Sequence, residues 1–157
     1  MSDSLARVDF DAFTRIASDA TQALRTLSAT AVNSGLERPL LELVKIRASQ
    51  LNGCAFCVQF HLNLARQLGV AAEKLDLVSV WQDAGVYSER ELAALAWCDA
   101  LTTHAARGAT DVGYAAVRQA FSESEVIFLT VAIGTINQWN RIAGALRFTP
   151  PVPKKAA

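Results

Sequence analysis

Hydrophobic residues along the chain recur with the period of a helix and not with that of a strand. The first stripe places an apolar side chain every three or four positions and comprises Phe10, Phe13, Ile16, Ala17, Ala20, Leu24 and Leu27. This spacing is typical of one face of an amphipathic helix, which Gly35 would end. The alternation of apolar and polar residues that indicates a half-buried strand is absent. We therefore expect an all-α protein.

Proline and glycine delimit the helices that follow. Pro39 stands at a favoured first-turn position of a helix that runs to about Asn52. The next helix begins at about Cys54 and ends before Gly69, because glycine readily adopts the left-handed conformation that closes helices. Residues 71–81 predict a shorter helix.

Two serine–glutamate capping boxes mark further helix starts. Ser88–Glu91 opens a helix that extends through Leu101, and Ser122–Glu125 opens a last long helix that ends near Leu146. Between them, residues 111–121 predict another short helix. Together the patterns predict about six to seven helices.

These helices are expected to form one compact, single-domain bundle over residues 1–157, since no repeat, low-complexity block or linker divides the chain. The core of this domain is expected over about residues 38–145. Residues 148–157 contain three prolines and predict a loose tail.

Charge and hydropathy exclude two classes of partner. The chain has 15 basic and 15 acidic residues, and its Lys and Arg residues form no basic stripe, so we expect no nucleic acid partner. The longest apolar run, Val126–Ile136, is interrupted by polar residues and is shorter than the roughly 18 residues of a membrane helix. We therefore expect no membrane partner, and the N-terminus shows no secretory signal pattern.

The cysteine count and the apolar content indicate where and how the chain works. Three cysteines are an odd number in a chain too large to need disulfide staples, which favours a reducing, cytoplasmic location. The hydrophobic share of 52% slightly exceeds the usual range and predicts tight helix packing together with a buried subunit interface.

The segment around the Cys-x-x-Cys pair carries the candidate chemistry. If the chain is helical from Cys54, then Cys54, Cys57 and His61 occupy positions i, i+3 and i+7 and share one face. Glu42 lies roughly 15 Å before the turn at residues 52–53, and His61 lies roughly 12 Å after it. If the two helices form an antiparallel hairpin, Glu42 and His61 therefore meet at similar depth.

These residue types suit thiol redox chemistry, and we take Cys57, Cys54, His61 and Glu42 as the candidate catalytic residues. A free thiol with a pKa of about 8.5 is mostly protonated at neutral pH, but the start of a helix and a nearby base favour the thiolate. His61, one turn from Cys57, can accept the proton, and Glu42 can orient it and favour its imidazolium form. The two cysteines can close a disulfide. This chemistry needs no bound organic cofactor.

Less specific interpretations remain open. The cysteines can be small buried side chains, and Glu42 can pair only with Lys45 at i, i+3. Haem attachment requires a histidine directly after the second cysteine, where this chain has Val58. The four candidate residues could ligate zinc, but a structural zinc site usually draws a second ligand pair from a distant segment and none is evident, so we expect no metal.

Other reactive or aromatic residues predict structural roles. Cys98 is expected in the core, and His104 near the carbonyl groups of a helix end. The polar cluster of residues 137–141 predicts either a solvated face or a buried network at a subunit contact. The tryptophans are expected to anchor the core or an interface: Trp81, Trp97 and Trp139.

Residues 42–61 follow the pattern Glu-x2-Lys-x-Arg-x-Ser-x2-Asn-x-Cys-x-Phe-Cys-x3-His. This pattern resembles the alkyl hydroperoxidase D and carboxymuconolactone decarboxylase family, and the cysteine pair resembles its thiol-bearing branch. Flanking matches lie at residues 65–69, 88–91 and 137–141, so the resemblance covers about residues 38–145.

The resemblance implies an all-helical fold that assembles as a homotrimer or homohexamer. By match, Cys57 attacks the hydroperoxide substrate, Cys54 resolves it, and His61 and Glu42 form a proton relay. An external thiol or dithiol reductant restores the pair. The dedicated peroxidase carries a second histidine just before its second cysteine, where this chain has Phe56.

The leading hypothesis is thus a thiol-dependent, peroxidase-like oxidoreductase that reduces hydroperoxides through Cys54 and Cys57. One alternative is a lyase of the carboxymuconolactone decarboxylase type that uses Glu42 and His61 as acid and base. A second alternative is a non-catalytic helical assembly module.

Overall fold

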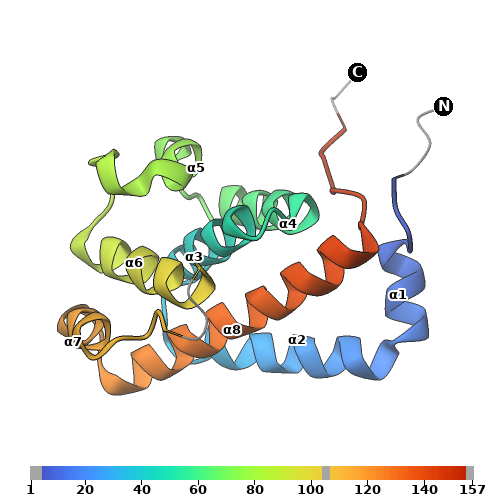
Figure 1. Ribbon diagram of the computed structural model, residues 1–157. Coiled ribbons are helices and arrows are strands. Elements are labelled where there is room, and N and C mark those ends of the chain that lie inside the picture. The colour runs from blue at the N-terminus through green and yellow to red at the C-terminus, as the bar shows by residue number, and fades with distance from the viewer. Residues whose placement is uncertain (1–4, 104–106, 155–157) are drawn as a thin grey trace.

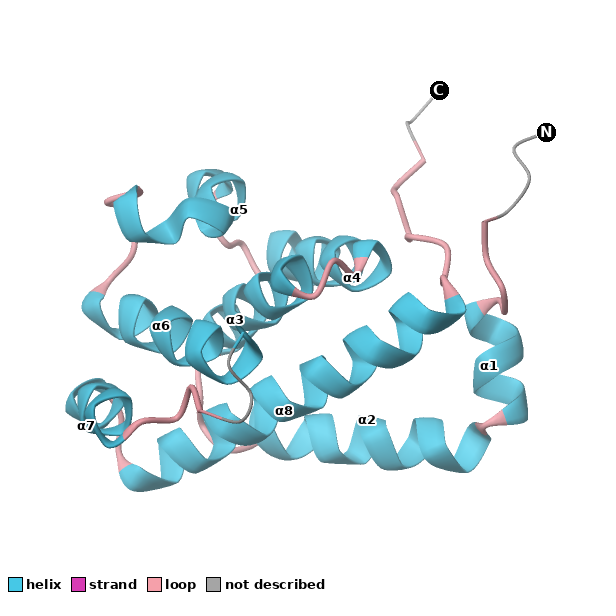
Figure 2. Cartoon of the chain, viewed as in Figure 1, coloured by secondary structure: helices cyan, strands magenta, loops and turns pink. Residues whose placement is uncertain are grey.

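A computed structural model of the chain describes residues 5–103 and 107–154, and within them helices alone form the regular structure (Figures 1 and 2). There are eight α-helices and one 3-10 helix in the described residues: α1 (Phe10–Ile16), α2 (Ser18–Val32), α3 (Arg38–Leu51), α4 (Ala55–Gln67), α5 (Ala72–Leu77), η1 (Val78–Asp83), α6 (Glu89–Thr103), α7 (Asp111–Ala120) and α8 (Glu123–Leu146). The all-α prediction is confirmed.

The predicted number of six to seven helices is too low, because the first apolar stripe forms two helices. Ala17 leaves the helical region with φ −108° and ψ 47°, and α1 turns sharply away from α2 (Figure 1). The turn lets Phe10 and Phe13 of α1 pack on the ring of Phe148, while α2 continues along α8. Tertiary packing of aromatic rings thus outweighs a periodicity that would suit one continuous helix.

Helix α3 lies at the centre and packs against α4, α6 and α8 (Figure 1). One side of α3 places Leu41, Val44 and Ala48 in the larger buried cluster, to which α2, α4, α6, α7 and α8 also contribute. Another side places Leu43 and Ile46 in a smaller cluster with residues of α4, α5, η1 and α6. A helix that is apolar on two sides belongs inside the protein, which makes α3 a rigid support for the site.

Both predicted capping boxes are present. The Ser122 hydroxyl accepts from the Glu125 N–H, and the Glu125 carboxylate accepts from the Ser122 N–H, at the start of α8. Ser88 and Glu91 make the same reciprocal bonds at the start of α6. These bonds satisfy N–H groups that have no partner within the helix, so local sequence defines both starts.

The two ends of the described chain lie on the same side of the molecule (Figure 1). Arg7 and Val8 donate backbone hydrogen bonds to the carbonyl of Leu146 at the end of α8. Phe148, which we expected to start a loose tail, is only 3% exposed and belongs to the larger buried cluster. Beyond it, Asn63 of α4 donates to the carbonyl of Pro151. Across the described residues, no helix is both long and apolar enough to cross a membrane.

Candidate functional site

The turn between α3 and α4 places the first cysteine at the start of a helix. Gly53 has φ 66°, a left-handed conformation that suits glycine, and its N–H donates to the carbonyl of Gln50. The Cys54 N–H then donates to the carbonyl of Ser49, and this bond ends α3. Cys54 is the N-cap of α4. This geometry directs the N-terminal end of α4 at the cysteine pair, as its position in the sequence predicted.

Cys54 and Cys57 are joined by a disulfide, with their Cα atoms 5.4 Å apart. The Cys57 N–H lies 3.3 Å from the Cys54 sulfur, which acts as the capping acceptor. Both residues are buried, at 2% and 3% exposure. The pair can therefore exist in the oxidised form in which a dithiol catalyst ends its cycle, and the sulfurs are shielded from bulk solvent.

Glu42 and His61 meet across the α3–α4 interface. The distance between Glu42 Oε2 and His61 Nδ1 is 2.6 Å, so the two residues lie at the same depth, as their spacing from the turn predicted. The other carboxylate oxygen accepts from Lys45 Nζ at 2.8 Å. The pairing of Glu42 with Lys45 is thus present, but the alternative that Lys45 is its only partner is wrong, because the carboxylate also contacts His61.

Burial and pairing set the charge states of this trio. Burial tends to raise the pKa of Glu42, but the hydrogen bonds and charges of His61 and Lys45 outweigh it and hold that pKa below its usual value. Burial lowers the pKa of His61, and the opposing hydrogen bond to Glu42 does not reverse the shift. Glu42 therefore favours the imidazolium form, as expected, but desolvation of His61 is the larger effect and keeps its pKa below the usual value.

His61 is consequently a neutral imidazole at neutral pH. A carboxylate only accepts hydrogen bonds, so we assign the ring hydrogen to Nδ1, where it is donated to Glu42. Nε2 is then left with a free lone pair. The arrangement can hold one tautomer of histidine in place and present its basic nitrogen.

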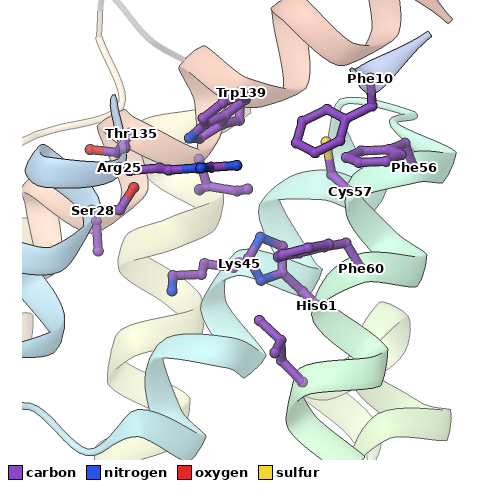
Figure 3. Close-up of a pocket in the computed structure, with 13 residues that line it drawn as sticks. Phe10, Arg25, Ser28, Lys45, Phe56, Cys57, Phe60, His61, Thr135 and Trp139 are labelled. Carbon is purple, nitrogen blue, oxygen red and sulfur yellow. The ribbon is translucent and has the colours of Figure 1, made fainter. Parts of the chain in front are cut away.

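A cavity of about 280 Å³ borders this group (Figure 3). Cys57 and His61 lie on its α4 wall, whereas Cys54 is not among the lining residues. Four aromatic side chains also line it, Phe56 and Phe60 from α4, Phe10 from α1 and Trp139 from α8, and most of the remaining lining comes from α2 and α8. The cavity therefore gives an apolar molecule access to Cys57 in particular.

A partly buried polar network ties α8 to the turn that precedes the cysteines. Asn52 donates to the side-chain oxygens of Asn137 and Asn140, each at 2.9 Å. Asn140, which is 3% exposed, donates to the Ser49 hydroxyl at 2.9 Å. Within the cluster at residues 137–141, Asn137 and Asn140 thus form a network within the chain that stabilises the position of the turn, whereas Gln138 and Arg141 are exposed.

Sequence reasoning missed the contributions of α1 and α2 to the cavity. Phe10 and Arg25 precede the Cys-x-x-Cys pair by about thirty residues or more and carry no motif that marks them as lining residues. Trp139, which we expected to be an anchor, also lines the cavity. Only the packing of α2 against α8 brings these side chains to the site.

The remaining expectations concern residues away from the cavity. Cys98 is fully buried, and burial raises the pKa of its thiol to about 12. Trp97 is a core residue that donates to Thr130, and Trp81 donates to Asp99. His104 lies outside the described residues.

The zinc alternative requires two free thiolates, which the Cys54–Cys57 disulfide does not offer in this state. In the described part of the chain, no group of three or more His, Cys, Asp or Glu side chains could hold a metal ion.

The fold and the site together define a class: an all-helical protein in which a Cys-x-x-Cys disulfide, a histidine and a carboxylate meet beside an apolar cavity. The sequence model of the carboxymuconolactone decarboxylase family matches residues 18–100, and the chain belongs to this family. With its cysteine pair it falls in the alkyl hydroperoxidase D-like, thiol-bearing branch.

Relatives cover most of the chain. The uncharacterized protein YdfG of Bacillus subtilis (strain 168) is 33% identical over 131 residues, which are 83% of this chain and 89% of the relative. A crystal structure from Agrobacterium tumefaciens, of a protein of unknown function provisionally named as the antioxidant defence protein AhpD, is 40% identical. It matches with a TM-score of 0.87 over 94% of this chain and 99% of its own.

The debrominase Bmp8 shows how far the fold extends beyond these relatives. It is 19% identical, with a TM-score of 0.78 over 88% of this chain and 75% of its own. A cysteine-to-alanine variant of Bmp8, 20% identical with a TM-score of 0.74, was crystallised with 2,3,4-tribromopyrrole. At this level of identity the likeness concerns the fold alone.

Proposed function

We propose that the protein is a thiol-dependent, peroxidase-like oxidoreductase that reduces organic hydroperoxides through Cys54 and Cys57. The observation that carries this proposal is that the disulfide closes at the start of α4 with Cys57 on the cavity wall beside His61. His61 is in turn held by Glu42. A nucleophile, its resolving partner, a base and an orienting carboxylate are thus present together.

In the reduced protein, the neutral His61 takes the proton of the Cys57 thiol. The bond from Nδ1 to Glu42 raises the basicity of the ring, and the N-terminal end of α4 favours negative charge near the cysteine pair. The relay therefore supplies the thiolate, which is the form that attacks a peroxide.

The Cys57 thiolate then attacks the terminal oxygen of the hydroperoxide. The O–O bond breaks, a sulfenic acid forms on Cys57, and the leaving alkoxide takes the proton from His61 to become an alcohol. The Cys54 thiol attacks the sulfenic acid, so that the disulfide forms and water leaves. In balance, one hydroperoxide and two thiols give one alcohol, one water and one disulfide.

An external thiol or dithiol must then reduce the disulfide, by attack on one sulfur and release of the other as a thiol. The cytoplasm, where we place the protein, maintains such reductants. Because both cysteines are buried, the thiol of the reductant must be carried on a narrow group that can enter the cavity.

Two other reactions compete with this proposal. A lyase would use Glu42 and His61 as acid and base, with the cysteines uninvolved. Reductive dehalogenation is suggested by the aromatic lining of the cavity and by the fold shared with Bmp8. The lyase would release carbon dioxide and the dehalogenase would release a halide ion, whereas a peroxidase produces an alcohol.

A thiol count before and after one equivalent of cumene hydroperoxide tests the proposal. The reduced protein has three free thiols and should retain one, with a mass decrease equal to two hydrogen atoms. Cys57→Ser should abolish peroxide consumption. Cys98→Ala is the matched control and should retain nearly full activity, since its buried thiol with a pKa of about 12 is not a thiolate at neutral pH.

Retention of all three thiols after peroxide treatment would contradict the peroxidase proposal. The same result accompanied by release of carbon dioxide from a lactone acid would favour the lyase. Equal loss of activity in Cys57→Ser and Cys98→Ala would show that the variants act through folding, which circular dichroism would reveal independently.

A further inference from the structure

The charges around the cavity do not cancel. Its described lining residues include Arg25 and Lys45 but no aspartate or glutamate. Behind the wall, Glu42 pairs with Lys45 and balances its charge, and His61 is neutral. One positive charge, on Arg25, remains uncompensated by the site.

Arg25 has a position from which it can contact a bound molecule. It belongs to α2, and Figure 3 shows its guanidinium extending into the cavity toward the wall that carries Cys57. No hydrogen bond or ion pair joins its side chain to another residue within 5–103 and 107–154. An arginine that lines a cavity with its five donors unused is equipped for an anion from solution.

The remaining surface of the cavity favours an apolar and preferably aromatic body. Phe10, Phe56 and Phe60 lie on the side of Cys57, and Trp139 lies on the side of Arg25 (Figure 3). Flat rings of this kind bind other rings by stacking and edge contacts. The volume of about 280 Å³ falls just below the ~300–1,000 Å³ usual for small-molecule sites, which suits a compact ligand.

We propose that the cavity selects substrates with a compact apolar or aromatic body and one carboxylate, and that Arg25 binds this carboxylate. Arg25 is exposed to solvent and so open to a ligand, and its guanidinium fork matches the two carboxylate oxygens. Because Arg25 and Cys57 lie on opposite walls, the carboxylate on Arg25 directs the other end of the molecule to the sulfur (Figure 3). This inference rests on the proposed function for the identity of the reacting group.

Binding of a non-reactive pair of probes tests the site without any turnover. 4-Isopropylbenzoate and the neutral 4-isopropylbenzamide have the same shape and differ in charge. We expect the wild type, measured by calorimetry or by tryptophan fluorescence at pH 7, to bind the benzoate about tenfold tighter than the amide, since a charge-assisted bond is stronger than a neutral one. Arg25→Gln should remove this preference, and Arg25→Lys should retain part of it.

Arg38→Gln is the matched control, because Arg38 is exposed at the start of α3 and does not line the cavity. It should bind both probes as the wild type does. Equal binding of the two probes by the wild type, binding of neither, or the same loss of preference in Arg25→Gln and Arg38→Gln would each overturn the proposal.

Turnover with the hydroperoxides of cumene and of its para-carboxylate separates this inference from the proposed function. If both hold, kcat/KM favours the carboxylate, and Arg25→Gln lowers that preference mainly through KM. Turnover of neither hydroperoxide, together with Arg25-dependent benzoate binding, would overturn the peroxidase and support the anion site. Turnover of both at equal rates in wild type and Arg25→Gln would support the peroxidase and overturn the anion site.

Discussion

Glu42 is the residue on which the rest of the site depends. It is 5% exposed, yet both carboxylate oxygens have partners, with Lys45 on one and His61 on the other. An unpaired buried carboxylate would be costly, so pairing explains how α3 can carry a charge at this depth. The same pairing fixes the tautomer of His61, which links the stability of the α3–α4 interface to the proposed chemistry.

Replacing Glu42 by glutamine should impair the thiolate more than the fold. Glu42→Gln keeps the shape but removes the charge that makes His61 more basic, so Cys57 should lose its proton at a higher pH. At neutral pH we expect alkylation of reduced Cys57 to slow by up to about tenfold, equivalent to about 1.4 kcal/mol. The measurement is the pH dependence of iodoacetamide labelling, with Cys98 replaced in all proteins.

Glu73→Gln serves as the control, because Glu73 lies exposed on α5. Coincident labelling profiles of Glu42→Gln and wild type would exclude Glu42 from the relay and leave its pairing with Lys45 as its role. Circular dichroism should show that the variant folds.

Among the secondary structure elements, α8 begins at a capping box formed by neighbouring residues and is also bonded to helices distant in sequence. Its capping box is reinforced by Arg90 of α6, which binds both Glu125 and Glu37 and lies 4.0 Å from the ring centroid of Phe121. Further along, Asn140 attaches α8 to α3. The helix is therefore held to its neighbours at its start and beside the cysteine turn.

The start of α8 should contribute stability that is lost in acid. The side-chain hydrogen bond with Arg90 and the bond from the Ser122 N–H lower the pKa of Glu125 from its ordinary 4.5 to about 2. A folded-state pKa below the unfolded value gives stability that is present above pH 4.5 and declines as the pH falls toward 2. Glu125→Gln should therefore be less stable than wild type by about 1 kcal/mol at pH 7, with the difference shrinking below pH 4.5.

Urea unfolding at several pH values measures this difference. Glu123→Gln alters the same first turn at an exposed side chain that makes no hydrogen bond or ion pair within the described part of the chain. Its effect on the free energy of unfolding should be smaller at every pH. A Glu125→Gln deficit that stays constant from pH 7 to pH 2.5 would show that charge is not its cause.

The molecule as a whole exposes more large apolar side chains than its own packing explains. Ile16 is 78% exposed, Val112 is 80% exposed and Ile127 is 55% exposed. Exposed apolar area of this kind is common at subunit contacts. We propose that these faces are covered in a homo-oligomer, for which the family resemblance favours a trimer or hexamer.

Light scattering at micromolar concentration should thus give a multiple of 16.9 kDa. Ile127→Glu, which places a charge on α8 away from the cavity, should shift the mass toward the monomer, whereas Glu123→Gln should not. A stable monomer of the wild type would contradict this prediction.

Local sequence determined the starts of α6 and α8 and the shared face of Cys54, Cys57 and His61. Each depends on groups within about one or two helical turns, so capping chemistry and helical spacing suffice to predict it. The meeting of Glu42 with His61 also followed from the sequence, because a tight turn leaves two connected helices little freedom except to pack as a hairpin.

Only the tertiary structure decided what surrounds the cysteine pair. The break at Ala17 depends on packing against Phe148. The position of Phe10 and Arg25 on the cavity and the bond that Asn52 donates to Asn140 likewise depend on contacts between segments distant in sequence. Their arrangement depends on how α1, α2 and α8 pack against α3 and α4, and an apolar stripe specifies that a face is buried but not which partner covers it. The candidate residues could therefore be predicted from the sequence, whereas the cavity beside them arises from helix packing.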